Sequence, residues 1–128
     1  MLTKEDAGPS TLFVVRAPLV SGVLEMVTEV AIGGPLAPGS HNATAMDISP
    51  GGRALLVRTY DRAHLFLRGD TETWVDALGR AALAVPVTAE LQGEAIAWRP
   101  DGRGYLTSSE GLMPPLHFFE NDARCPAY

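Results

Sequence analysis

The amino-acid sequence predicts an all-β protein, because its composition and an internal repeat both favour short strands. Thirteen glycines and ten prolines make up about a fifth of the 128 residues, which suits strands joined by tight turns better than long helices. The stretch from Asn42 to Leu67 also resembles the stretch from Gln92 to Phe119. Each stretch contains a proline at the same place, Pro50 in the first and Pro100 in the second, fifty positions apart. Self-similarity at a period of about 40 to 50 residues is typical of propellers and solenoids. The repeat therefore predicts adjoining β units that cover one another's apolar faces.

The first forty residues predict two strands, at 11–16 and 24–31. Both segments are rich in β-branched and other apolar residues. They resemble the third and fourth strands of a repeat unit. Residues 1–40 are therefore expected to form an N-terminal tail and the last two strands of a preceding unit.

Residues 41–90 predict a complete unit of four antiparallel strands. Polar and apolar residues alternate toward the end of 43–49, and the strand ends at the turn Ser-Pro-Gly-Gly. Proline second and glycine fourth suit a type I turn followed by a residue of positive φ, which lets two strands continue as a hairpin. The second and third strands then follow at 53–59 and 63–67.

A short helix is expected to interrupt this unit at about 72–79. Thr71 or Thr73 can cap its N-terminus, and Gly79 is placed to end it. The fourth strand is expected at 82–88. A proline inside this strand indicates an outer edge, because proline cannot donate a hydrogen bond to a ladder.

Residues 91–128 predict the first three strands of a further unit and a C-terminal tail. The turn Arg-Pro-Asp-Gly repeats the earlier turn, and strands follow at 103–109 and 116–119. Four antiparallel strands with one tight hairpin, repeated along the chain, form the blade of a β-propeller. The sequence therefore predicts a β-propeller fragment of about two to two and a half blades.

Two sets of short motifs carry a resemblance to known families. Ser-Pro-Gly-Gly-Arg at 49–53 and Arg-Pro-Asp-Gly-Arg at 99–103 resemble the SPDG hairpin of bacterial WD40-like and TolB-like propellers. Gln-Gly-Glu-Ala-Ile-Ala at 92–97, with Thr-Ser-Ser-Glu-Gly at 107–111, is similar to the pattern of phytase-like and esterase-like six-bladed propellers. The resemblance implies a propeller with more blades than this chain contains. It also implies a candidate activity, the calcium-dependent hydrolysis of phosphate esters.

Charge and hydropathy argue against several kinds of partner. A net charge of −5 disfavours nucleic acid, whose phosphates need a surplus of Lys and Arg. No apolar run reaches the roughly eighteen residues that a membrane helix needs, and the N-terminus lacks the apolar core of a signal peptide. We therefore expect a soluble chain without a membrane partner, of undetermined compartment. Its one cysteine, Cys125, is expected to be a free thiol.

The candidate ligand-binding residues are Glu94, Glu110 and Arg58. Glu94 lies at the entry to the first strand of a unit, which lines the channel of a propeller, so it is placed either to bind a ligand or to hydrogen-bond a loop. Glu110 ends a second strand and is placed either to form a polar cluster with Arg58 and Ser108 on one face or to make a hydrogen bond or ion pair between neighbouring units. No catalytic residue is indicated, because the sequence lacks Gly-x-Ser-x-Gly, a phosphate-binding glycine loop and a His-x-x-x-His pair.

The sequence predicts no metal site. His64 and His117 occupy equivalent strand positions in two units, and metal ligands must meet within a few Å of the ion. One glutamate, Glu94, is too few for calcium, which takes several oxygen ligands. Calcium enters only with the hydrolase alternative, and no other cofactor is expected.

Two functions of different classes follow from these observations. The first is a non-enzymatic scaffold or binding module, a partial propeller completed by self-association or by blades outside this chain. Such a fragment exposes apolar faces and unpaired strand edges, which favour association with another copy. The two N-terminal strands of one copy could complete the C-terminal unit of another. The alternative is a calcium-dependent phytase-like or esterase-like hydrolase, with Glu94 as a ligand.

Overall fold

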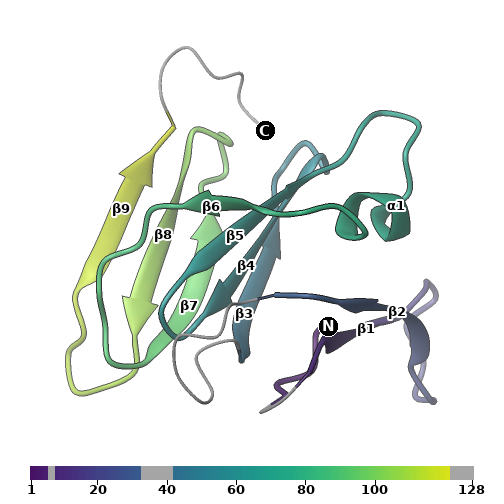
Figure 1. Ribbon diagram of the computed structural model, residues 1–128, viewed down its shortest axis with the longest axis horizontal. Coiled ribbons are helices and arrows are strands. Elements are labelled where there is room, and N and C mark those ends of the chain that lie inside the picture. Colours follow the sequence, from purple (N-terminus) through teal and green to yellow (C-terminus); the bar gives the residue numbers. More distant parts are fainter. Residues whose placement is uncertain (6–7, 33–41, 122–128) are drawn as a thin grey trace.

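The computed structural model describes residues 1–5, 8–32 and 42–121, and these fold mostly into antiparallel strands (Figure 1). Cys125 and residues 33–41 lie outside the described residues. Within the described part, the strands form sheets of two, four and three strands. The prediction of an all-β protein is confirmed. The elements are β1 (Ser10–Val14), β2 (Glu25–Val30), β3 (Ala43–Ile48), β4 (Ala54–Thr59), β5 (Ala63–Leu67), α1 (Trp74–Leu78), β6 (Leu83–Val85), β7 (Gly93–Trp98), β8 (Gly104–Ser109) and β9 (Leu116–Glu120).

The four-stranded sheet is a meander in which β3, β4, β5 and β6 pair in chain order. Its last strand, β6, has three residues where the sequence predicted a strand over 82–88. The strand ends early because Pro86 follows it directly, and proline has no N–H to continue the ladder. As expected for such a strand, β6 lies at the outer edge of its sheet.

The three-stranded sheet repeats the first three strands of the four-stranded sheet. Val57 of β4 pairs with His64 of β5, and Thr107 of β8, fifty positions after Val57, pairs with His117 of β9. Both first hairpins also carry an irregularity at the same place, between the first and third residues of β3 and of β7. The repeat seen in the sequence is therefore a repeat in register, and the predicted equivalence of His64 and His117 is confirmed.

Both hairpin turns follow from their proline and glycine positions. The Gly52 N–H donates to the Ser49 carbonyl at 2.8 Å, and the Gly102 N–H donates to the Arg99 carbonyl at 3.0 Å. The φ angles of Gly52 and Gly102 are 69° and 67°, in the left-handed region that glycine adopts without steric cost. A Pro-x-Gly sequence thus produces the same turn in each unit.

The short helix α1 begins where a capping box allows it. The Thr73 hydroxyl accepts a hydrogen bond from the Asp76 N–H at 3.2 Å, and the Asp76 carboxylate accepts one from the Thr73 N–H at 3.2 Å. Of the two threonines that the sequence offered as caps, Thr73 is the one used. The helix ends at Gly79, as predicted, and is shorter than the expected span of 72–79.

The four-stranded sheet is the middle layer of three layers (Figure 1). All six residues of its second strand, β4, are buried, and alternate side chains of a strand point to opposite faces. A strand covered on both faces needs a continuous apolar run, which Ala54 to Val57 supplies. One core contains Val30, Ile32, Ala43, Leu55, Val57, Phe66 and Leu78, and the other contains Ala54, Leu56, Ala63, Leu65, Ile96, Trp98 and Tyr105.

The four-stranded and three-stranded sheets meet along their first strands, since β7 lies against β3 and β4. Two hydrogen bonds join β3 to β7. The Thr44 hydroxyl donates to the Gly93 carbonyl at 2.7 Å, and the Trp98 N–H donates to the Asp47 carboxylate at 2.8 Å. These bonds lie near opposite ends of the two strands and set their relative position.

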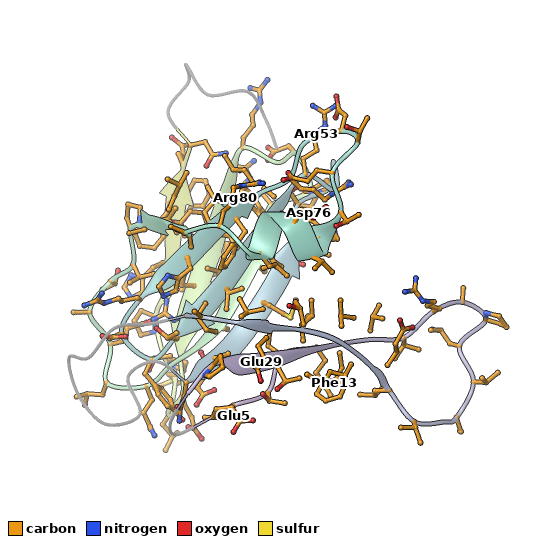
Figure 2. All side chains as sticks on the ribbon, turned by 45° about the vertical axis from the view of Figure 1, so that its right-hand side comes forward. Glu5, Phe13, Glu29, Arg53, Asp76 and Arg80 are labelled. Carbon is orange, nitrogen blue, oxygen red and sulfur yellow. The ribbon has the colours of Figure 1, made fainter. Side chains whose placement is uncertain are left out.

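The two-stranded sheet lies on the other side of the middle layer, where Val30 of β2 packs in one core with Val57 and Phe66. The chain start lies along its first strand, β1, where the Thr3 N–H donates to the Thr11 carbonyl at 2.9 Å. Figure 2 shows the hairpin of β1 and β2 extending away from the remaining strands. No sheet closes on itself in residues 1–5, 8–32 and 42–121, and no helix there is long and apolar enough to cross a membrane.

Candidate functional site

A buried ion pair and a partly exposed histidine meet between the four-stranded and three-stranded sheets, at the end where β4 finishes and β7 begins. Arg58 is the penultimate residue of β4, and Glu90 lies in the segment that joins β6 to β7. His117 is the second residue of β9. We refer to Arg58, Glu90 and His117 as the inter-sheet cluster.

Arg58 is fully buried, with 0% of its surface exposed. Along β4 it points to the same side as Leu56, toward the three-stranded sheet. Its guanidinium lies against the backbone of Gly93, where a β-carbon would overlap it. The equivalent residue in the preceding unit is Ala43, so a glycine at position 93 is what admits the arginine.

The charge of Arg58 is balanced within the cluster. Its Nη2 donates to Glu90 Oε2 at 2.6 Å, and both side chains are buried. His117 Nε2 lies 3.4 Å from Glu90 Oε1, within ion-pair distance but without forming a hydrogen bond. Arg58 Nε and Nη1 have no hydrogen-bond partner. A buried charge without a partner costs several kcal/mol, so the Glu90 carboxylate is required by Arg58.

Aromatic residues fix the segment that carries Glu90. The Tyr105 hydroxyl donates to the Pro86 carbonyl at 2.5 Å. Burial raises the pKa of Tyr105 to about 12, an effect that the nearby Arg58 charge partly opposes. The Tyr105 ring stacks on Phe119 with centroids 5.2 Å apart and meets Trp98 edge-on at 6.2 Å. Tyr105 therefore holds the start of the joining segment to the three-stranded sheet.

Glu94, the first of the predicted ligand-binding residues, lies outside this cluster. Its carboxylate is 3.5 Å from the Lys4 ammonium, and that ammonium also sits 4.5 Å from the centre of the Tyr60 ring. Glu94 thus contacts the N-terminal segment. Both side chains of the pair are partly exposed, so the pair stabilises the fold only weakly.

Glu110 is not brought to Arg58, and the cluster expected from Arg58, Glu110 and Ser108 does not form. Arg58 pairs with Glu90 instead, and the Ser108 hydroxyl donates to the Pro115 carbonyl at 3.2 Å. The Glu110 residue is exposed and uses its backbone N–H to bind the Gln92 carbonyl at 2.9 Å. Glu110 and Arg58 do not meet because the Arg58 side chain points into the space between the sheets, whereas Glu110 begins an exposed loop.

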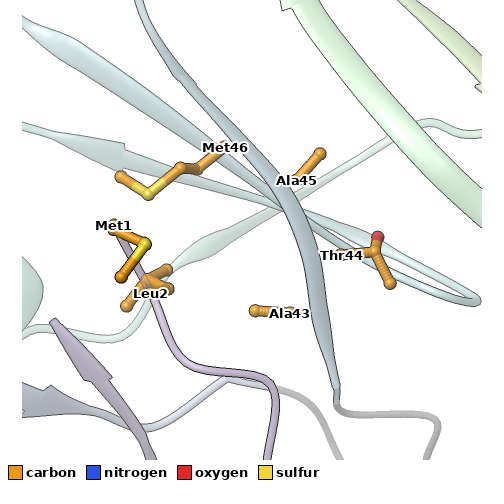
Figure 3. Close-up of a pocket in the computed structure, with 6 residues that line it drawn as sticks. All are labelled: Met1, Leu2, Ala43, Thr44, Ala45 and Met46. Carbon is orange, nitrogen blue, oxygen red and sulfur yellow. The ribbon is translucent and has the colours of Figure 1, made fainter.

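A cavity of about 220 Å³ lies between the N-terminal segment and β3 (Figure 3). The Thr44 hydroxyl in its wall is already engaged with the Gly93 carbonyl. The other wall residues are apolar, so the cavity offers volume but little polar recognition. Its lining residues are Met1, Leu2, Ala43, Thr44, Ala45 and Met46. Elsewhere in the described ranges, no three His, Cys, Asp or Glu side chains are grouped so as to hold a metal ion.

Sequence reasoning selected Arg58 but missed Glu90. The sequence did contain a signal for the inter-sheet cluster, because two positions differ between the repeated units. The second unit has Gly93 where the first has Ala43, and Ser108 where the first has Arg58. A large side chain in one unit, together with a glycine at the start of the next unit, indicates that the large side chain occupies the space which the glycine leaves open. The partner acid could not be found in this way, because it lies on a joining segment without a repeat counterpart.

No family model matches the chain, and neither the curated proteins nor the solved structures contain a match to it.

Proposed function

We propose that this chain is a non-enzymatic scaffold or binding module of the β-propeller type, a partial ring completed by self-association or by blades outside this chain. The observation that carries the proposal is the structural repeat. Two antiparallel units with the same register and the same hairpin turn adjoin along their first strands, β3 and β7. A propeller is built from repeated antiparallel sheets, so a four-stranded unit followed by a matching three-stranded unit supports this proposal.

The contact between the units supports a structural role for the inter-sheet cluster. Arg58 and Glu90 are buried against each other, so their charges are used to join β4 to the segment that leads into the three-stranded sheet. The hydroxyl of Thr44 and the carboxylate of Asp47 are likewise used between β3 and β7. The Arg58 nitrogens that have no hydrogen-bond partner are fully buried and out of reach of a substrate, which favours a scaffold over an enzyme.

The outer surfaces support the second half of the proposal. β9 and β6 lie at the edges of their sheets, and a sheet edge is a template for pairing with another chain. Large apolar side chains are exposed both on the β1–β2 hairpin, including Val20 and Val23, and near β9, including Leu112 and Leu116. Large exposed apolar side chains that gather in one region are typical of sites of protein association.

The solution mass tests the proposal. Light scattering coupled to size-exclusion chromatography, at micromolar concentration, is expected to give a defined oligomer. A strict monomer at these concentrations would contradict completion by self-association. The same measurement with calcium and with a chelator, together with thermal unfolding, tests the hydrolase alternative. That alternative requires calcium to stabilise the fold, because a ligand bound only by the folded state must raise its stability.

A further inference from the structure

We infer that the arm between β1 and β2, residues 15–24, binds the free edge of β9 in a second copy of the chain. The inference rests on the proposed function, because it names the two surfaces through which the copies associate. Each copy offers its arm to one neighbour and its β9 edge to the other. The contact is therefore head-to-tail.

The free edge of β9 is the place where the repeat is incomplete. β5 occupies the equivalent position, and its outer side pairs with β6 through residues 63–65. No strand in the described part of the chain pairs with the outer side of β9. The Asn121 N–H donates to the Arg103 carbonyl at 3.0 Å, so alternation directs the N–H groups of Leu116 and Phe118 outward. No strand of the described residues takes these outward groups, so they can pair with an added strand.

The surface around the start of this edge is apolar, whereas charged side chains lie at its far end, at Glu120, and beside Phe118, at Arg99. Leu112 is 98% exposed, and Met113 and Leu116 are also largely exposed. Phe118 is 42% exposed, with the Arg99 guanidinium 5.1 Å from its ring centre. Residues 111–116 contain no charged side chain. The edge thus offers backbone hydrogen-bonding groups together with apolar side chains.

The arm has the complementary properties. Leu19 and Val20 are 79% and 74% exposed, and Val23 is fully exposed. Residues 17–23 are uncharged, and the charges at the base of the arm neutralise each other, since Arg16 Nε lies 2.9 Å from Glu25 Oε2. Figure 2 shows the arm projecting from the rest of the molecule. An apolar segment without its own sheet partner is suited to join another sheet.

The occupant of the β9 edge is a second copy for two reasons. The arm and β9 lie at opposite ends of the molecule (Figure 1), so one chain cannot join them. Residues 17–23 of the arm and residues 111–116 beside β9 are uncharged in a chain of net charge −5, so neither segment indicates a partner of opposite charge, and two copies can join these segments without burying like charges. A head-to-tail contact closes into a ring if its rotation allows, and otherwise extends.

Single substitutions test the two surfaces separately. Val20→Asp places a charge in the arm, and Leu116→Pro removes an outward N–H without touching the bonds from β9 to β8. We expect each to weaken association by about tenfold or more, measured by light scattering over a dilution series. Leu116→Ala keeps the N–H and is expected to weaken association less than Leu116→Pro does. Val75→Asp, on the exposed side of α1, is the control and should leave the mass unchanged. Circular dichroism spectra verify that each variant folds.

Mixing the two defective variants distinguishes a head-to-tail contact from a symmetric one. The Val20→Asp copy keeps an intact β9 edge, and the Leu116→Pro copy keeps an intact arm. Their mixture is expected to form a one-to-one dimer that grows no further. If both variants keep the wild-type oligomer, or if the mixture stays monomeric, this inference is overturned while the proposed self-association stands. A monomeric wild-type protein overturns both.

Discussion

Arg58 shows how one buried charge determines the contact between two sheets. Its guanidinium has no access to solvent and reaches one anion, Glu90. Taking a charged pair out of water is costly, and such a pair holds only when both partners are present. The two residues are therefore coupled far more strongly than an exposed ion pair such as Lys4 with Glu94.

Removal of Arg58 alone is expected to be strongly destabilising. Arg58→Met leaves the Glu90 carboxylate buried without its cation, and the free energy of unfolding should fall by roughly 3–5 kcal/mol. Adding Glu90→Leu should recover much of this loss, because no charge then remains unpaired. Chemical denaturation of the wild type, both single variants and the double variant measures the coupling. A single-variant loss below about 1 kcal/mol would show that the pair is solvated.

Gly93 is expected to tolerate alanine only when Arg58 is absent. A β-carbon at position 93 overlaps the guanidinium, so Gly93→Ala should lower the free energy of unfolding by about 1–3 kcal/mol. In an Arg58→Ser background the same change should cost little. Gly69→Ala is the control, because a β-carbon there would make ordinary contact with Glu72 at 3.6 Å. Equal effects of Gly93→Ala in both backgrounds would disprove the steric explanation.

His64 is expected to make stability depend on pH. Burial lowers its pKa below the ordinary value of 6.5, Arg62 lowers it further, and Asp61 opposes the shift. The unfolded chain therefore binds a proton at a higher pH than the folded chain, so stability is lost as the pH falls below about 6.5 and through the folded pKa. Denaturation between about pH 7 and pH 5 should show a smaller loss for His64→Leu than for the wild type. NMR titration of the imidazole gives the shift directly, and a raised pKa would contradict it.

At the scale of single elements, the capping box of α1 is a local feature with a global consequence. The helix has five residues and gains little from its own hydrogen bonds. Its buried Leu78 nevertheless belongs to the core beneath the two-stranded sheet. The cap therefore helps to place a core side chain.

Thr73→Ala is expected to lower the free energy of unfolding by about 1 kcal/mol, because it removes the acceptor for the Asp76 N–H. Hydrogen bonds from Thr73 also hold the pKa of Asp76 below its usual value, so part of the stabilisation should disappear in acid as Asp76 is protonated. Thermal unfolding at neutral and acid pH measures both effects. Thr71→Ala, on the cap candidate that is not used, should be close to neutral.

At the scale of the whole molecule, three stacked layers leave exposed edges and apolar surface at opposite ends. A chain of net charge −5 repels its own copies over distances comparable to the Debye length. Residues 17–23 of the arm and residues 111–116 beside β9 are uncharged, so contact between these segments does not depend on attraction between charges.

Salt is therefore expected to strengthen association. Raising the ionic strength from about 0.01 M to about 0.15 M shortens the Debye length from about 30 Å to about 8 Å and reduces the repulsion between copies. Sedimentation equilibrium should show a higher average mass at the higher salt concentration. A falling mass would indicate that ion pairs hold the copies together, and would point to surfaces other than those proposed.

The sequence alone determined the local architecture. Interactions among residues a few positions apart produce the Pro-x-Gly turns, the strands that follow them and the helix near Thr73. The first and last residues of these elements were therefore predicted closely. The register of the repeat was likewise visible, since Pro50 and Pro100 align it. The span predicted for the fourth strand was too long, because Pro86 was placed inside the strand rather than after its end.

Only the tertiary structure decided which side chains meet. The partner of Arg58 is Glu90 rather than Glu110, because the strand directs the guanidinium between the sheets and the joining segment brings the acid there. The contact of Glu94 with Lys4 depends in the same way on how the chain start lies against distant strands. Such pairings are set by long-range packing, and neither spacing nor periodicity along the chain encodes them.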